Sequence, residues 1–261
     1  MLSQTDIGIS TGAYGEYSLG AALHHIAELA PSAEICSWGR HSLLLPANAR
    51  VVGASGLPFS VHGPFTHAHF ATSSPEKHRV ALDLHRRHIY AAAELGAHLY
   101  VVHPDLHNKA RPWNKKVVAS LHRTFEALRL LQDEIGIEVA VENMPHARKS
   151  HFTAPGDVEL NGLGFVLDVG HAMLTGTLNQ FVTQHNGELH HLHLHDNGGW
   201  GTGDKHLALG AGVVDFEPAL REARAAGATI ILEHKCEEDV HTSLRYLKEK
   251  GLLTPNGVAV P

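Results

Sequence analysis

The sequence has few cysteines and no run of basic residues, and each shortage excludes a class of protein. Its two cysteines, Cys36 and Cys236, are too few for a disulfide framework in 261 residues. We expect both to behave as small buried hydrophobic residues near strand ends. The net charge is −6 with histidine neutral. This argues against tight electrostatic binding to nucleic acid, although an acidic protein can still carry a local basic groove.

Membrane and export signals are also missing. No apolar run reaches the roughly 18 residues needed to span a bilayer. Residues 1–6 lack the basic region followed by an apolar core that is typical of a secretory leader. We therefore expect a cytoplasmic protein without a membrane partner.

Histidine, in contrast, is abundant: the 24 histidines outnumber the 21 lysines and arginines together. The densest stretch alternates His and Leu, which is the period of a strand and places His191, His193 and His195 on one face. A glycine-rich turn then leads to Asp204 and His206. Imidazole and carboxylate in this density suit zinc. The stretch predicts one wall of a multinuclear metal site.

Short apolar runs recur along the chain and alternate with amphipathic helical segments. The predicted strands are 7–10, 33–36, 59–62, 99–103, 138–142, 164–168, 189–195 and 229–233. The predicted helices are 18–29, 47–54, 74–95, 114–135, 155–160, 178–184, 217–226 and 238–250. Eight such units in about 250 residues predict an α/β protein with a single (β/α)8 TIM barrel. We place the barrel at residues 1–253 and expect 254–261 to be a loose C-terminal tail.

Residues with metal-binding side chains recur where these strands end. Those at or close to strand ends are His62, His103, Glu142, Asp168, His193 and Glu233, and those just beyond, in loops, are His171, Asp204 and His206. The C-terminal strand ends of such a barrel share one rim, so these side chains should converge. A single acid or histidine there is more often structural. The whole set would suffer severe desolvation and repulsion unless cations neutralised it.

Three nearby residues on the same stretch have other expected roles. One of His191 and His195 is expected to hold a metal ligand in place, as metal-bound imidazoles usually require. The alternative is that both only fill layers of the barrel. Asp196 is expected to orient the following loop rather than to bind metal.

Several motifs, taken in order, resemble the xylose isomerase-like TIM-barrel superfamily. They are Ser60-Val61-His62-Gly63-Pro64-Phe65, Val101-Val102-His103-Pro104, Val141-Glu142-Asn143-Met144-Pro145, Leu167-Asp168-Val169-Gly170-His171, His193-Leu194-His195-Asp196-Asn197, Asp204-Lys205-His206-Leu207-Ala208-Leu209-Gly210 and Leu232-Glu233. The superfamily includes endonuclease IV and many sugar (phosphate) isomerases and epimerases. The resemblance covers nearly the whole chain.

The resemblance implies one of two sets of metal ligands. The sugar-isomerising branch uses one cation, which Glu142, Asp168, His193 and Glu233 would hold here. Endonuclease IV uses three zinc ions, and this chain has every residue of that pattern. The first metal would be held by His62, His103 and Glu142; the second by Glu142, Asp168, His193 and Glu233; the third by His171, Asp204 and His206.

Two features set the chain apart from the DNA enzyme. The loop Thr11-Gly12-Ala13-Tyr14-Gly15-Glu16-Tyr17 is more similar to a sugar-isomerase loop. Arg40 is expected to contact a phosphate or sugar rather than to probe DNA. Phe65 and Thr66 follow His62 at the place where the DNA enzyme has residues that penetrate its substrate, and Phe65 can equally wall a small pocket. A small phosphorylated or sugar-like substrate is therefore favoured over DNA.

The leading hypothesis is a metal-dependent hydrolase of a phosphoester, with up to three divalent cations. A hydroxide bridging the first two would be the nucleophile. Zinc is the expected metal, with manganese and iron as alternatives. The rival is a sugar, sugar phosphate or cyclitol isomerase, epimerase or dehydratase with one cation, in which Glu142 or Glu233 moves a proton. A metal-storing or sensing protein is disfavoured because the ligands face a predicted pocket, and no oligomeric state is predicted.

Overall fold

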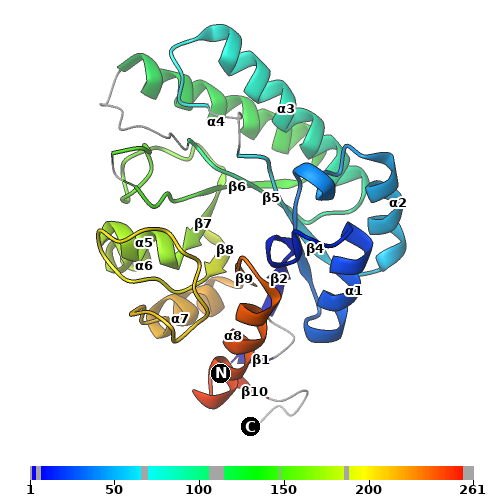
Figure 1. Ribbon diagram of the computed structural model, residues 1–261. Coiled ribbons are helices and arrows are strands. Elements are labelled where there is room, and N and C mark those ends of the chain that lie inside the picture. Colours follow the sequence, from blue (N-terminus) through cyan, green and yellow to red (C-terminus); the bar gives the residue numbers. More distant parts are fainter. Residues whose placement is uncertain are drawn as a thin grey trace.

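The chain folds into a closed barrel of parallel strands (Figure 1). The computed structural model describes residues 2–3, 7–65, 70–105, 115–146, 148–184 and 188–254. The barrel strands are β2 (Ile7–Ser10), β3 (Ala33–Cys36), β4 (Phe59–His62), β5 (Leu99–Val102), β6 (Glu138–Glu142), β7 (Gly164–Asp168), β8 (Leu189–Leu194) and β9 (Thr229–Leu232). Each strand pairs with the next along the chain, and β9 closes the barrel on β2 through the Ile7 and Ile230 register. The predicted (β/α)8 architecture is confirmed.

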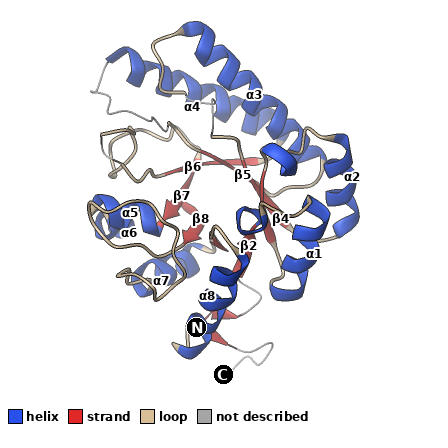
Figure 2. Cartoon of the chain, in the orientation of Figure 1, coloured by secondary structure: helices blue, strands red, loops and turns tan. Residues whose placement is uncertain are grey.

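Helices surround the strands on the outside of the barrel (Figure 2). They are α1 (Leu19–Leu29), α2 (Pro46–Ser55), α3 (Pro75–Glu94), α4 (Lys115–Ile135), α5 (Val169–Thr175), α6 (Leu178–Gln184), α7 (Glu217–Ala226) and α8 (Glu237–Glu249), with short 3₁₀ helices at η2 (Thr11–Tyr14) and η3 (Gly39–His41). Within the described residues, the helices are too short or too polar to cross a membrane.

Local sequence signals explain where these elements begin and end. Ser74 caps α3 by accepting a hydrogen bond from the Lys77 amide, and Pro75 occupies the first turn. Gly176 and Gly227 end α5 and α7 in the left-handed conformation that glycine adopts without strain. β5 is buried on both faces, and its sequence, Leu99–Val102, is apolar throughout.

Two helical predictions differ from the structure. Residues 155–160 form turns rather than a helix, because Gly156 has a φ of 83° and the Asp157 carboxylate accepts hydrogen bonds from the amides of Thr153 and Ala154. Conversely, α5 was not predicted, since it follows β7 without a loop and includes Gly170. His171, which we placed in a loop, therefore lies in the first turn of α5.

The ends of the described chain also pair. β1 (Leu2–Ser3) and β10 (Leu253–Thr254) form a two-stranded parallel sheet outside the barrel. Thr254 of the predicted tail is thus part of a strand, and residues 255–261 lie outside the described residues.

Candidate metal centre

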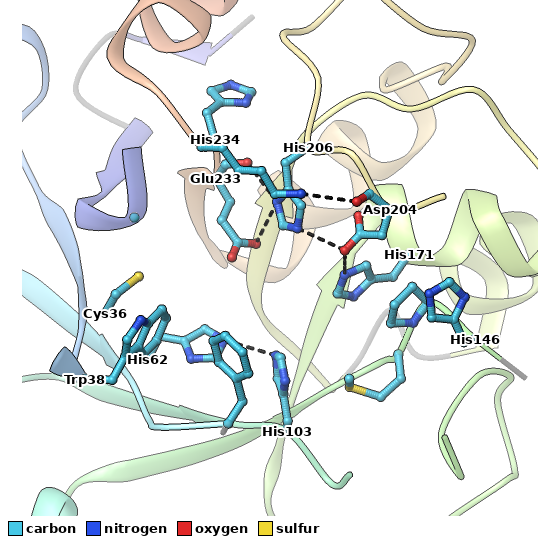
Figure 3. Close-up of a pocket in the computed structure, with 15 residues that line it drawn as sticks. Cys36, Trp38, His62, His103, His146, His171, Asp204, His206, Glu233 and His234 are labelled. Atoms are coloured by element: carbon cyan, nitrogen blue, oxygen red, sulfur yellow. Dashed lines mark hydrogen bonds and ion pairs between the residues drawn. The ribbon is translucent and has the colours of Figure 1, made fainter. Parts of the chain in front are cut away.

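Six of the nine predicted ligands line one cavity at the C-terminal ends of the strands, and the other three, Glu142, Asp168 and His193, are buried and contact them. The cavity has a volume of about 300 Å³. In Figure 3, His62 and His103 lie on one side of it, and His171, Asp204 and His206 lie on the other. Their donor atoms fall into three groups, and within each group the atoms lie within 4.8 Å of one another.

The first group consists of His62, His103 and Glu142. The Nε2 atoms of His62 and His103 are 3.1 Å apart, and they lie 3.2 and 3.0 Å from the same Glu142 Oε2. Zinc–ligand distances of about 2.0–2.1 Å in a tetrahedron separate neighbouring ligand atoms by roughly 3.3 Å. The three donors therefore have the spacing that a zinc ion needs.

The second group centres on His193 Nδ1. This atom lies 3.2 Å from Glu233 Oε2, 3.6 Å from Glu142 Oε2 and 3.9 Å from Asp168 Oδ2. One imidazole nitrogen cannot supply a proton to three carboxylates at once. The excess of anionic oxygen around it suits a cation.

The third group contains His171, Asp204 and His206, together with His195, which we had not included among the metal ligands. His206 Nε2 and His171 Nε2 lie 3.1 and 3.5 Å from Asp204 Oδ2. His206 has a φ of 51°, a left-handed conformation that is unfavourable for a residue with a side chain. Such strain is retained where the surrounding structure enforces it, which is common at functional sites.

Backbone contacts fix the tautomer of three of these histidines. Nδ1 of His62 lies 2.8 Å from the Gly63 carbonyl oxygen. Nδ1 atoms of His171 and His206 likewise lie 2.9 and 3.2 Å from the carbonyl oxygens of Asn143 and Glu233. A carbonyl only accepts, so each Nδ1 carries the proton and donates it. Where a cation takes the place of the second proton, each ring would direct an Nε2 lone pair at it beside the carboxylates, the arrangement that metal-binding imidazoles adopt.

Several buried donor atoms lack hydrogen-bond partners among the described residues. Among the predicted ligands they are Glu233 Oε2, Asp204 Oδ1, His103 Nδ1 and both ring nitrogens of His193, and Glu34 Oε1 also lacks a partner. Glu233 Oε2 and His193 Nδ1 are close enough to bond but lack the geometry for it. Buried polar atoms are almost always paired, so this donor set fits bound divalent cations.

The carboxylates also shift the pKa values of the histidines. Burial alone would lower the pKa of His206, but the nearby Glu233 and Asp204 outweigh it and raise that pKa to about 9. Burial is outweighed in the same way at His171, by Asp168 and Asp204, and its pKa lies well above the usual value. A site that raises imidazole pKa values is a site that attracts positive charge.

The opposite shifts occur at the acids. Burial would raise the pKa of Glu142, yet His103 and His193 hold it well below the usual value. The pKa of Glu233 is likewise lowered against the effect of burial, by His193 and His206. Both acids are therefore ionised at neutral pH and available as ligands.

One acid of the site was not predicted from the sequence. Glu34 lies within β3 and is completely buried in the barrel, where its Oε1 is 3.1 Å from His193 Nε2 and its Oε2 is 2.9 Å from His191 Nε2. Ser60 Oγ donates to Oε2 over 3.2 Å. A carboxylate behind a metal-binding imidazole sets its tautomer and orientation. The sequence feature that could have identified Glu34 is an acidic residue inside a short, otherwise apolar predicted strand.

The loop that carries Asp204 and His206 is held by Asp196. Its carboxylate accepts backbone hydrogen bonds from Gly210, Gly212 and Val214 at 2.9–3.1 Å, as expected for a residue that orients the loop. A Cβ on Gly212 would lie 2.3 Å from Asp196 Oδ1. Only glycine allows this close approach.

The residues that distinguish the chain from the DNA enzyme have different positions. Phe65 lines the cavity beside Trp38, with ring centroids 4.8 Å apart. Arg40 instead donates to the Glu16 carbonyl oxygen and is not among the residues lining this cavity. Thr66 lies outside the described residues.

Sequence relatives span most of the chain. An uncharacterized protein of Methanocaldococcus jannaschii, MJ1614, is 26% identical over 250 residues, which are 93% of this chain and 98% of that protein. A protein of Mycobacterium leprae named "Probable endonuclease 4" is 28% identical over 227 residues, or 79% of this chain and 84% of the relative.

Solved structures share the fold. A D-tagatose 3-epimerase-like protein superposes with a TM-score of 0.82 at 26% identity, covering 94% of this chain and 96% of the other. The TTHB071 protein of Thermus thermophilus, from a crystal soaked with zinc chloride, gives 0.72 at 24% identity, with 94% and 97% covered. Endonuclease IV of the same organism gives 0.67 at 20% identity, with 94% and 98% covered.

A family model described as xylose isomerase-like TIM barrel matches residues 47–250, most of the chain. The match includes six of the eight barrel strands and all nine predicted ligands. The chain therefore belongs to the xylose isomerase-like TIM-barrel family.

Proposed function

We propose that the protein is a metal-dependent hydrolase of phosphoesters that holds up to three divalent cations, with zinc expected. The observation that carries the proposal is the position of Glu142. Its Oε2 faces His62, His103 and His193, and its Oε1 lies 3.2 Å from His171 Nδ1. One carboxylate thus contacts all three groups, which favours a single multinuclear centre over separate structural sites.

The residues of this centre suit attack on a phosphoester. Bound divalent cations would lower the pKa of a water molecule and stabilise the negative charge that develops on phosphoryl oxygens. Glu142 would keep the first and second groups at a fixed spacing, and His62 and His103 would orient them from the cavity wall. The described residues show no Ser-His-Asp nucleophile at the cavity, and this chemistry does not need one.

The cavity favours a small substrate. A volume of about 300 Å³ is at the lower end of the range for small-molecule sites, about 300–1,000 Å³. Trp38 and Phe65 form an apolar wall on the side of the first group, and Lys235 lies at the cavity beside Asp204. The phosphoryl group would face the histidines and acids while the organic part of the substrate packs on the aromatic wall.

A second candidate is a sugar or sugar phosphate epimerase or isomerase. It is favoured by the TM-score of 0.82 to the D-tagatose 3-epimerase-like protein and by the size of the cavity. In this case Glu142, Asp168, His193 and Glu233 would hold one cation, and Glu142 or Glu233 would move a proton at the carbon next to a carbonyl. The third group would then have no role in the reaction.

Elemental analysis of protein purified without chelators separates the two candidates. We expect between two and three equivalents of divalent metal per chain for the hydrolase, and about one for the epimerase. The loaded protein is then assayed with a nitrophenyl phosphodiester, with duplex DNA containing an abasic site, and with ketohexoses. Absence of phosphoester cleavage by protein that holds its full metal content would contradict the proposal.

His206→Ala tests the same choice in one variant. The hydrolase should lose one metal equivalent and most of its activity, because His206 belongs to the third group. His24→Ala is the control, since this histidine is exposed on α1 and its change should alter neither property. Full activity of His206→Ala would point to the epimerase.

A further inference from the structure

His195 directly follows β8 and is completely buried behind the third group. Its ring stacks on His206 with the centroids 3.9 Å apart and the planes 20° from parallel. The ring of His171 crosses it at 74°, with a centroid distance of 5.5 Å. The other members of the group line the cavity, so His195 approaches the same point from the barrel side.

Gly170 makes this position available. A Cβ placed on Gly170 would lie 2.0 Å from Cε1, 2.4 Å from Nδ1 and 2.5 Å from Nε2 of His195. These distances are too short for any side chain, so the imidazole occupies the space that a residue at position 170 would otherwise fill. The packing fixes the ring in one place beside the group.

The ring nitrogens of His195 have different surroundings. Nδ1 lies 3.5 Å from the Asp196 carbonyl oxygen, which accepts hydrogen bonds only. Nε2 lies 3.0 and 3.1 Å from the two carboxylate oxygens of Asp168. If Nδ1 carries the proton, the Nε2 lone pair faces the Asp168 carboxylate. The two would repel each other unless a cation lay between or beside them.

We propose that His195 is a fourth protein ligand of the third cation and closes that position. The inference rests on the proposed metal centre. Three imidazoles and one carboxylate make four protein ligands, the number found in structural zinc sites, whereas catalytic sites keep a position open. The first group has only His62, His103 and Glu142, and it retains that open position. Substrate would therefore meet metal at the first group, while the third cation organises the loop that carries Asp204 and His206.

The rival role is positioning. His195 would then only donate its Nε2–H to Asp168 and act through the second group. The two roles differ in what a glutamine at this position can replace, because the glutamine amide can donate to Asp168 but supplies no imidazole.

His195→Gln and Gly170→Ala are compared with the wild-type protein and with His191→Gln. His191 is a buried histidine on the same face of β8, but it contacts Glu34 and lies outside the third group. Zinc is titrated into each metal-free protein under a competing chelator. Cobalt(II) is titrated in parallel, and its visible absorption reports how many equivalents are tetrahedral.

We expect the third equivalent to bind at least about 100-fold more weakly in both test variants, beyond the usual loss for a residue that only orients a ligand, about 10–100-fold. The cobalt absorption of one tetrahedral equivalent should be lost in both, and His191→Gln should keep it. Gly170→Ala displaces the ring without removing a histidine, so it tests the proposal even if His195→Gln folds poorly.

Wild-type affinity for the third equivalent in His195→Gln, with an unchanged cobalt spectrum, would overturn the inference and leave the metal centre intact. Failure of the wild-type protein to bind more than one equivalent is a different result, because it would remove the proposed function itself. The two failures appear in different proteins and cannot be confused.

Discussion

Two buried polar layers lie one above the other inside the barrel. Both contain carboxylates and imidazoles, but in different proportions. The lower layer contains Glu34, Ser60 and His191; the upper layer contains Glu142, Asp168, His193 Nδ1 and Glu233. In the lower layer, one carboxylate faces a hydroxyl and two imidazole nitrogens at 2.9–3.2 Å. In the upper layer, three carboxylates face one nitrogen at 3.2–3.9 Å.

The two nitrogens of His193 show the difference most directly. Its Nε2 faces one carboxylate, Glu34, whereas its Nδ1 faces three, and one proton cannot satisfy all three. His193 belongs to both layers. If its Nε2–H donates to Glu34, its Nδ1 lone pair points into the upper layer, where the proposed cation would bind it.

Among the variants that test this difference between the layers, Glu142→Gln should have the largest effect. This carboxylate contacts all three groups, and its loss should remove at least two metal equivalents. Phosphoester cleavage should fall by about 10³-fold or more, because a single preorganised electrostatic contact can be worth about 10²–10³ alone. The control is Glu138→Gln, at the other end of β6. Normal metal content in Glu142→Gln would mean that the upper layer is not organised around this residue.

Removal of metal should destabilise the protein through the upper layer. At a free metal concentration 100 times the dissociation constant, binding contributes about 2.7 kcal/mol of stability. For a chain of this size, about 2–4 °C per kcal/mol converts that into a fall in Tm of roughly 5–10 °C. Calorimetry before and after chelation measures it. An unchanged Tm would mean that the upper layer, like the lower layer, is a hydrogen-bond network that needs no cations.

The metal-free protein should also show a distinct pH dependence. His206 has its pKa raised to about 9 in the folded state, against about 6.5 unfolded. Its contribution to stability is complete below pH 6.5 and is lost as the pH rises through 9. The Tm of the metal-free protein should therefore decline over this interval, and that of the loaded protein should decline less. A flat profile for the metal-free protein would argue that the folded and unfolded pKa values are equal.

These layers also show what the sequence could and could not predict. The upper layer was predictable because its residues lie at the ends of successive strands. A TIM barrel brings the C-terminal ends of all its strands to one rim, however far apart they are in the sequence. The alternation of His and Leu in β8 identified the inward face correctly. Glu34 was not found, because its partner His193 lies on a strand far along the chain and a single acid in a four-residue strand carries no periodic signal.

The role of His195 was also beyond the sequence. The alternating pattern put it on the same face as His191 and His193, but the three rings have different neighbours. Only the structure shows that His195 fills the space left by the missing side chain of Gly170 and so reaches the third group. Such a fit between a ring and a missing Cβ depends on helix α5, which the sequence pattern did not reveal because it follows β7 without a loop and includes Gly170.

Glu34→Gln sharpens the comparison by changing the lower layer alone. The variant keeps the shape of the side chain but removes the charge that faces His193. We expect about 10–100-fold weaker metal binding at the second group, the usual loss when the partner of a metal-binding imidazole is removed. The first and third groups should be unaffected. Glu34, His191 and His193 also lie close enough together to hold an ion. If Glu34→Gln lost one metal equivalent completely while the other equivalents kept normal affinity, the lower layer would itself be a cation site, and the two layers would not differ.

The smallest effect is expected from His191→Gln, which leaves Glu34 and His193 in place. Burial lowers the pKa of His191, so its ring is neutral at pH 7 and contributes a hydrogen bond rather than a charge. The glutamine amide can donate to the same Glu34 oxygen. Metal affinity should therefore change by less than about tenfold, below the range for a direct partner of the ligand. If the loss equalled that of Glu34→Gln, the two residues would act as one unit, and the orientation of His193 would depend on the whole lower layer rather than on a single carboxylate.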